Sequence, residues 1–79
     1  MTKLPILSSR QVIKALKIAG FEDAPKRGKG SHLALIKKAK EGLRLVIIPE
    51  RKSIPRGTLR SILDQAGLSR DEFIRLLNL

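Results

Sequence analysis

The chain contains no cysteine, no tryptophan and no tyrosine, and its 79 residues include only one histidine. Without cysteine it can form neither a disulfide nor a thiolate metal site, which fits a reducing compartment. A single imidazole excludes a histidine relay and a histidine metal cluster. No apolar run is long enough for a signal peptide or a bilayer span. We therefore expect a cytoplasmic protein with no membrane association, no metal and no cofactor.

Carboxylates and aromatic rings are also scarce. The closest acidic pairs, Glu22-Asp23 and Asp71-Glu72, are adjacent residues rather than converging groups, so the carboxylate cluster of a metal-dependent nuclease is missing. The two aromatic residues, Phe21 and Phe73, stand at positions expected to pack helices. A stacking platform for unpaired bases is therefore not expected, and recognition of a nucleic acid should depend on phosphates and shape.

Positive charge, in contrast, is abundant. The chain has 17 Lys+Arg against 7 Asp+Glu, a formal net charge of +10. From Lys26 to Arg60, eleven basic residues are opposed only by Glu41 and Glu50, so this segment holds +9 of that charge. Such a bias is typical of proteins that bind polyanions: nucleic acid, which we favour, an anionic membrane or an acidic protein. The expected phosphate contacts are Lys37, Lys38, Lys40, Arg44, Arg51 and Lys52.

The first helix is predicted from its boundary residues. Ser8 and Gln11 have the spacing of a capping box. Apolar residues then recur at helical spacing, and Gly20 follows as a left-handed terminating residue with Phe21 beyond it. These features predict a helix from Ser9 to Ala19.

Similar boundary residues recur near the end of the chain. Pro55 can open a helix, because its missing amide hydrogen would have no helical partner there, and Gly67 can end it. Ser69 and Glu72 form a second capping box, which predicts a short third helix reaching Leu77.

Between the helices the pattern changes to short β-strands. We expect strands at Phe21–Lys26, His32–Lys38 and Leu43–Ile48, with a hairpin turn at Ala39–Gly42. The predicted order is α-β-β-β-α-α, an α+β domain spanning residues 1–79. Its three-stranded antiparallel sheet should pack against helices on one face. Both faces of the third strand are apolar, so periodicity leaves its register open.

The only histidine, His32, closes the glycine-containing run Arg27–His32 at the start of a predicted strand. Histidine transfers protons near neutral pH, and the neighbouring cations would attract an anion. This combination is consistent with a general acid or base beside a phosphate. A lone histidine is, however, more often a surface or structural residue, and spacing alone does not decide between these roles.

Several blocks of the sequence resemble the HicA family of mRNA-interferase toxins. The blocks are Gly30–His32 opening a strand, Pro55–Leu63, Gln65–Ser69 and the first-helix motif Val12–Phe21. They extend over residues 8–77 in the order and spacing of that family. The resemblance implies a double-stranded-RNA-binding-domain-like fold, ribosome-independent mRNA cleavage and neutralisation by a HicB-type antitoxin. It also implies that His32 is the catalytic residue.

Two positions depart from the family pattern. Many members follow the catalytic histidine with a second one, where this chain has Leu33, and many have a histidine where this chain has Arg51. No second imidazole is then available as the complementary acid or base. Lys29, Arg51 or a water molecule would have to fill that role.

The chemistry favours RNA as substrate, because the RNA 2′-hydroxyl is a built-in nucleophile that needs no metal. Backbone amides from Gly28 to Ser31 could face the phosphate as an anion nest. The residues expected to bind RNA are Lys29, Gly30, Ser31, Lys37, Lys38, Arg51 and Lys52. Two alternatives stay open: a non-catalytic RNA-binding module of the same fold, and a basic protein-interaction domain. The sequence leaves undecided whether His32 is the base or the acid.

Overall fold

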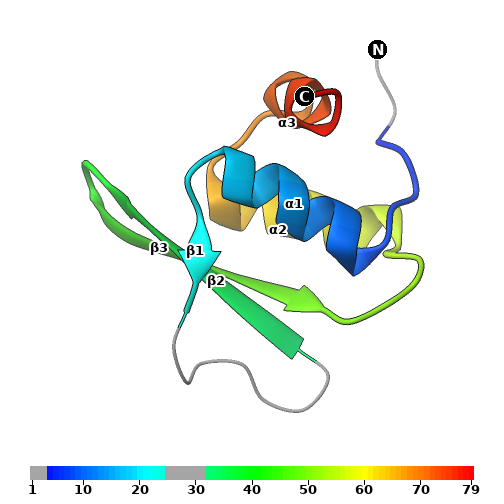
Figure 1. Ribbon diagram of the computed structural model, residues 1–79, viewed down its shortest axis with the longest axis horizontal. Coiled ribbons are helices and arrows are strands. Elements are labelled where there is room, and N and C mark those ends of the chain that lie inside the picture. The colour runs from blue at the N-terminus through cyan, green and yellow to red at the C-terminus, as the bar shows by residue number, and fades with distance from the viewer. Residues whose placement is uncertain (1–3, 25–31) are drawn as a thin grey trace.

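A computed structural model describes residues 4–24 and 32–79 of the chain. Three helices lie on the same side of an antiparallel sheet whose strand order is β1-β2-β3 (Figure 1). The predicted α+β architecture and the order of its elements are confirmed. In chain order the elements are α1 (Ser9–Ile18), β1 (Glu22–Asp23), β2 (His32–Ala39), β3 (Gly42–Pro49), α2 (Arg56–Ala66) and α3 (Arg70–Leu77).

Helix α1 has the predicted end structures. The Gln11 amide donates to the Ser8 hydroxyl at 3.3 Å, and the Gln11 side chain accepts from the Ser8 amide at 2.9 Å. At the other end Gly20 has a φ of 105°, and the Phe21 amide donates to the Leu16 carbonyl at 3.0 Å. These bonds satisfy backbone groups that the helix itself leaves unpaired. Helix α1 begins at Ser9 as predicted and ends at Ile18, one residue before the predicted Ala19, which is its C-cap.

Helices α2 and α3 follow the prediction with one difference. Pro55 is the N-cap of α2 rather than its first helical residue: its backbone is extended, and its carbonyl accepts the Leu59 amide at 2.9 Å. The Ser69–Glu72 capping box begins α3 as expected. Hydrogen bonds from the Ser69 amide and hydroxyl lower the pKa of the exposed Glu72 carboxyl.

Strand β1 is shorter than the predicted Phe21–Lys26. The Phe21 amide is committed to the end of α1 and its ring is buried, so pairing with β2 begins at Glu22, opposite Ile36. The Ala24 amide still reaches the Ala34 carbonyl at 3.0 Å. Lys26 lies outside the described residues.

The structure resolves the register of β3. Val46 and Ile48 face the helices and are fully buried, whereas Leu43, Leu45 and Ile47 face away from them. In β2, Leu35 opposite Val46 is buried as well, and Ala34 is buried although its partner Ile47 is exposed. The fully buried side chains that form the centre of the core are Val12, Leu16, Leu35, Val46, Ile48, Ile54, Leu59, Ile62 and Phe73. Both phenylalanines are therefore buried, as the sequence predicts.

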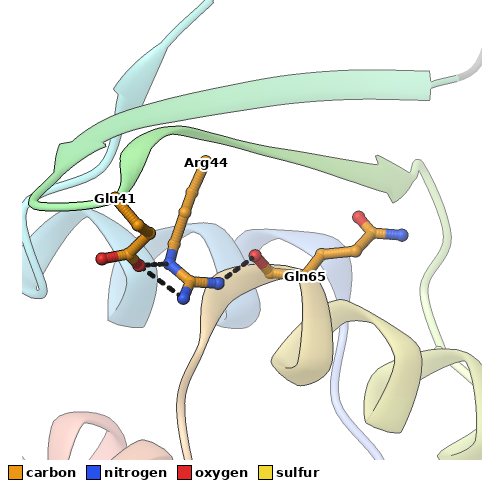
Figure 2. Close-up of polar contacts among 3 residues, drawn as sticks. All are labelled: Glu41, Arg44 and Gln65. Atoms are coloured by element: carbon orange, nitrogen blue, oxygen red, sulfur yellow. Dashed lines mark hydrogen bonds and ion pairs between the residues drawn. The ribbon is translucent and has the colours of Figure 1, made fainter.

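Arg44 ties the β2–β3 hairpin to the end of α2 (Figure 2). Its guanidinium donates to the Glu41 carboxylate at 2.6 and 3.0 Å and to the Gln65 carbonyl at 3.3 Å. The Glu41 pKa is lowered, first by a bond from its own backbone amide and then by Arg44. A Cβ added at Gly67 would lie 2.6 Å from the Arg44 guanidinium carbon. Gly67 thus allows the close approach of Arg44.

We predict opposite effects of alanine at two glycines of the α2 region. Gly67→Ala should lower the free energy of unfolding by about 1–2 kcal/mol, because Gly67 has a φ of 72° and its Cβ would displace Arg44. Gly57→Ala, where a Cβ meets nothing within 4 Å, should raise that free energy by up to about 0.5 kcal/mol. Urea unfolding of both variants checks this. Equal destabilisation by the two alanines would contradict the role given to Gly67.

Candidate functional site

His32 lies at the first position of β2, exposed to solvent, and is paired in register with Pro49 at the end of β3. Leu33, its neighbour, is paired with the buried Ile48. Since side chains alternate along a strand, His32 is on the sheet face opposite the helices. The segment that follows Pro49 therefore leaves the sheet beside the histidine.

Ser9, at the start of α1, is hydrogen-bonded to the segment that follows Pro49. The Ser9 amide and hydroxyl both donate to the Arg51 carbonyl, at 2.9 and 2.7 Å, and the Arg51 amide donates back to the Ser9 hydroxyl. Ser9 is the only buried polar residue among those described, at 5 % exposure. Three hydrogen bonds at one residue thus fix the backbone that presents the exposed Arg51 and Lys52 side chains.

Two further contacts hold the same pair of segments together. The Ile54 amide donates to the Leu7 carbonyl at 2.7 Å, and the Arg56 side chain donates to the Leu4 carbonyl at 2.8 Å. Leu4, Leu7 and Ile54 are all buried in the core. In Figure 1 the N-terminal segment, in blue, runs beside the yellow-green segment between β3 and α2. We call this pairing of residues 4–9 with residues 51–56 the N-terminal clasp.

A hollow of about 330 Å³ opens where the clasp meets β2. Ile13 and Leu33 give it apolar walls, while Arg10 adds a cation from α1 to those of the clasp. The lining residues are Ser8, Ser9, Arg10, Ile13, Leu33, Glu50, Arg51 and Lys52. The hollow is thus next to the histidine strand and is bordered by three basic side chains.

The structure brings together only some of the residues predicted for the site. Arg51 and Lys52 follow the strand end that is paired with His32. Lys37 and Lys38 stand at the hairpin end of β2, roughly 17 Å and 20 Å along the strand from His32 at ~3.3 Å per residue. Lys29, Gly30 and Ser31 lie outside the described residues.

Lys37 has a structural partner. Its ammonium group donates to the Ala19 carbonyl at 2.7 Å and lies 5.6 Å from the centre of the Phe21 ring. It thereby satisfies a carbonyl at the C-terminal end of α1 and covers an aromatic residue of the core. Substituting Lys37 would consequently change stability as well as any contact with phosphate.

Sequence reasoning did not identify Ser9 or Arg10 as parts of the site. Ser8 and Ser9 are adjacent, and the capping-box pattern accounts for Ser8 alone. Ser9 is a polar residue on the apolar side of a predicted amphipathic helix. Because a buried hydroxyl needs a hydrogen-bond partner, this position was the signal in the sequence that Ser9 bonds to another segment.

Neither a metal-ligand cluster nor a membrane-spanning helix occurs among the described residues. No three His, Asp or Glu side chains within residues 4–24 and 32–79 gather as metal ligands would. None of the helices in the described part of the chain combines the length and apolar character that crossing a membrane requires.

The fold and site define a class: a small basic α+β protein with helices on one face of a three-stranded sheet and a histidine beside a cationic segment. A family model described as the HicA toxin of bacterial toxin–antitoxin systems matches residues 9–68. The chain belongs to this family of toxins. None of the curated proteins compared with the chain matches it. The matched residues contain α1, the whole sheet and α2.

We predict that Ser9→Ala weakens the N-terminal clasp. Loss of the hydroxyl leaves the Arg51 amide without its partner, so the free energy of unfolding should fall by about 1–3 kcal/mol. Hydrogen exchange at the Arg51 amide should accelerate as well. Ser61→Ala, at an exposed serine of α2, is the matched control and should change the stability little. Unchanged exchange at Arg51 in Ser9→Ala would contradict the clasp.

Proposed function

We propose that this toxin is a metal-independent endoribonuclease that cleaves mRNA, with His32 as its catalytic residue. The observation that supports the proposal most directly is the exposed histidine at the strand end next to the clasped Arg51–Lys52 segment. Membership of a family whose members are generally mRNA interferases supports the same conclusion.

The proposed reaction is attack by an RNA 2′-hydroxyl on the adjacent phosphorus. His32 transfers one proton, either from the 2′-hydroxyl or to the leaving oxygen, which is the role that an imidazole takes in general acid–base catalysis. Arginine side chains do not exchange protons readily in proteins, so the Arg51 guanidinium is proposed to stabilise the developing negative charge rather than to move a proton. The complementary proton transfer then falls to Lys29 or a water molecule. No step in this scheme requires a metal ion.

In the proposed complex, the RNA backbone extends from His32 past the basic side chains at and beside the N-terminal clasp. Arg10, Arg51 and Lys52 border the hollow beside β2 and can contact successive phosphates. Lys38, at the far end of the strand, would contact a phosphate well away from the cleaved bond. Lys29, Gly30 and Ser31 remain proposed contacts to the reacting phosphate, as an anion nest.

The proposed partner in the cell is a HicB-type antitoxin, acting on a single toxin domain that comprises residues 1–79. A type II antitoxin is a protein, and one that neutralises this toxin must block access of RNA to His32. The net charge of +10 favours an acidic partner surface.

The decisive variant is His32→Ala. Cleavage of a defined RNA should fall by ~10²–10⁴-fold, since one proton-transfer group is removed, while RNA binding persists. The assay is run in excess EDTA, in which the wild-type protein should stay active. If His32→Ala cleaves at the wild-type rate, His32 is not the catalytic residue. If wild type and variant bind RNA equally and neither cleaves it, the protein is the non-catalytic RNA-binding module instead.

Phosphate contacts can be separated from catalysis by the salt dependence of RNA binding. For each protein, the logarithm of the RNA association constant is plotted against the logarithm of the salt concentration. Alanine at Arg51 or Lys52 should reduce the magnitude of the slope by up to ~0.7 for single-stranded RNA, because one fewer counterion is released. His32→Ala should leave the slope nearly unchanged. Lys14→Ala, at an exposed lysine of α1, is the charge-matched control. If the Arg51 and Lys52 variants both keep the wild-type salt dependence, the RNA does not bind at the N-terminal clasp.

A further inference from the structure

Three arginines from two helices line a second hollow, which lies on the helix side of the fold. Its volume is about 300 Å³, and the residues that line it are Leu4, Arg56, Gly57, Arg60 and Arg70. Arg56 and Arg60 belong to the first turns of α2, and Arg70 begins α3. None of these lining residues carries a carboxylate. We call this cavity the arginine hollow.

The arginine hollow is separate from the site around His32. Helices α2 and α3 lie on the same side of the sheet (Figure 1), whereas His32 is on the opposite face. No residue lines both this cavity and the hollow beside β2. A group bound between Arg60 and Arg70 is therefore not the phosphate that would react at His32.

The end of the N-terminal clasp positions Arg56 at this hollow. Its Nε donates to the Leu4 carbonyl at 2.8 Å, and Leu4 is buried in the core. This bond fixes the direction of the guanidinium. A guanidinium has five N–H donors, so the terminal nitrogens of Arg56, which bond to no other residue in the described part of the chain, remain for a ligand.

The electrostatics of the arginine hollow favour an anion. Arg56 and Arg60 are one turn apart on the same face of α2, where like charges repel each other. They also stand at the positive end of the helix dipole, and α2 has neither an acidic residue in its first turn nor a side-chain cap. The ion pairs of the described residues, Lys17–Asp23 and Arg44–Glu41, leave Arg60 without a carboxylate partner. An anion in the hollow would relieve this repulsion and accept from the first amides of the helix.

The lining residues favour phosphate among anions. Guanidinium groups bind phosphate oxygens through paired N–H donors, and a phosphate has enough oxygens for three arginines, whereas a carboxylate has only two. The lining residues include neither an aromatic ring nor a side-chain amide that would hold a base. We propose that the arginine hollow is a phosphate-binding site separate from His32, filled either by a free phosphate or by a phosphate of an RNA backbone.

The N-terminal clasp connects the hollow to the cationic segment beside His32. Arg51 and Arg56 are five residues apart, a separation that extended backbone spans in at most about 18 Å. An RNA strand bound at Arg51 can therefore extend to the arginine hollow. This RNA source rests on the proposed function, whereas binding of free phosphate does not.

The first test is a titration with inorganic pyrophosphate at constant ionic strength, followed by NMR. In the wild-type chain, the signals of the Gly57 amide and the Arg60 side chain should shift and saturate, while those of Arg75 stay in place. Arg60→Gln should weaken pyrophosphate binding at least ~10-fold, because one charge-assisted hydrogen-bond donor group is lost. Arg75→Gln, at an exposed arginine of α3 outside the hollow, removes the same charge and should bind as wild type does.

A second titration distinguishes the two sources of phosphate. The probe is a single-stranded oligoribonucleotide with methylated 2′-hydroxyls, so that the 2′-hydroxyl cannot attack and binding alone is measured. If RNA fills the hollow, Arg60→Gln should weaken RNA binding several-fold more than Arg75→Gln does. If free phosphate is the ligand, the two variants should bind RNA equally and differ only toward pyrophosphate.

Two results would overturn the phosphate site. One is equal binding of pyrophosphate by the Arg60 and Arg75 variants. The other is a pyrophosphate-induced shift at Arg75 as large as that at Arg60, which would indicate non-specific attraction by the net charge of +10. If the wild-type chain binds pyrophosphate in the hollow but cleaves no RNA, the phosphate site stands and the proposed nuclease function fails.

Discussion

The hydrogen-bonded pairing of residues 4–9 with residues 51–56 is the constraint on which the candidate site depends. Ser9 joins the start of α1 to Arg51, and Leu7 joins the same segment to Ile54. Because Leu7 and Ile54 are also core residues, the packing that stabilises the fold simultaneously fixes the cationic segment beside His32. The geometry of the candidate site is thereby coupled to the global stability of the fold.

The basic residues divide into two groups with different tasks. Lys37 binds the Ala19 carbonyl and Arg44 binds Gln65, so these cations satisfy carbonyls at the C-terminal ends of helices. Arg51 and Lys52 extend from the clasp into solvent. Net charge alone does not distinguish the groups, because a lysine facing a helix end and a lysine facing a phosphate look alike in composition.

Local rules explain why much of the fold could be predicted from the sequence. Capping residues such as Ser8 and Ser69 act within four positions, so the helix boundaries are encoded nearby. The register of β3 and the environment of Lys37 depend instead on contacts between distant segments. The role of Ser9 was missed for the same reason: its partner, Arg51, is 42 residues away. The assignment of His32 as a catalyst came from the family resemblance, and it remains a proposal.

The proposed mechanism requires that RNA itself supplies the nucleophile and that His32 moves the proton. The most direct test is the chemistry of the product ends, determined by mass spectrometry after cleavage in EDTA. Attack by the 2′-hydroxyl predicts a 2′,3′-cyclic phosphate on one fragment and a 5′-hydroxyl on the other, and no cleavage where a 2′-deoxynucleotide precedes the scissile bond. Products with a 5′-phosphate and a 3′-hydroxyl, or cleavage of the deoxy-substituted RNA, would contradict the claim.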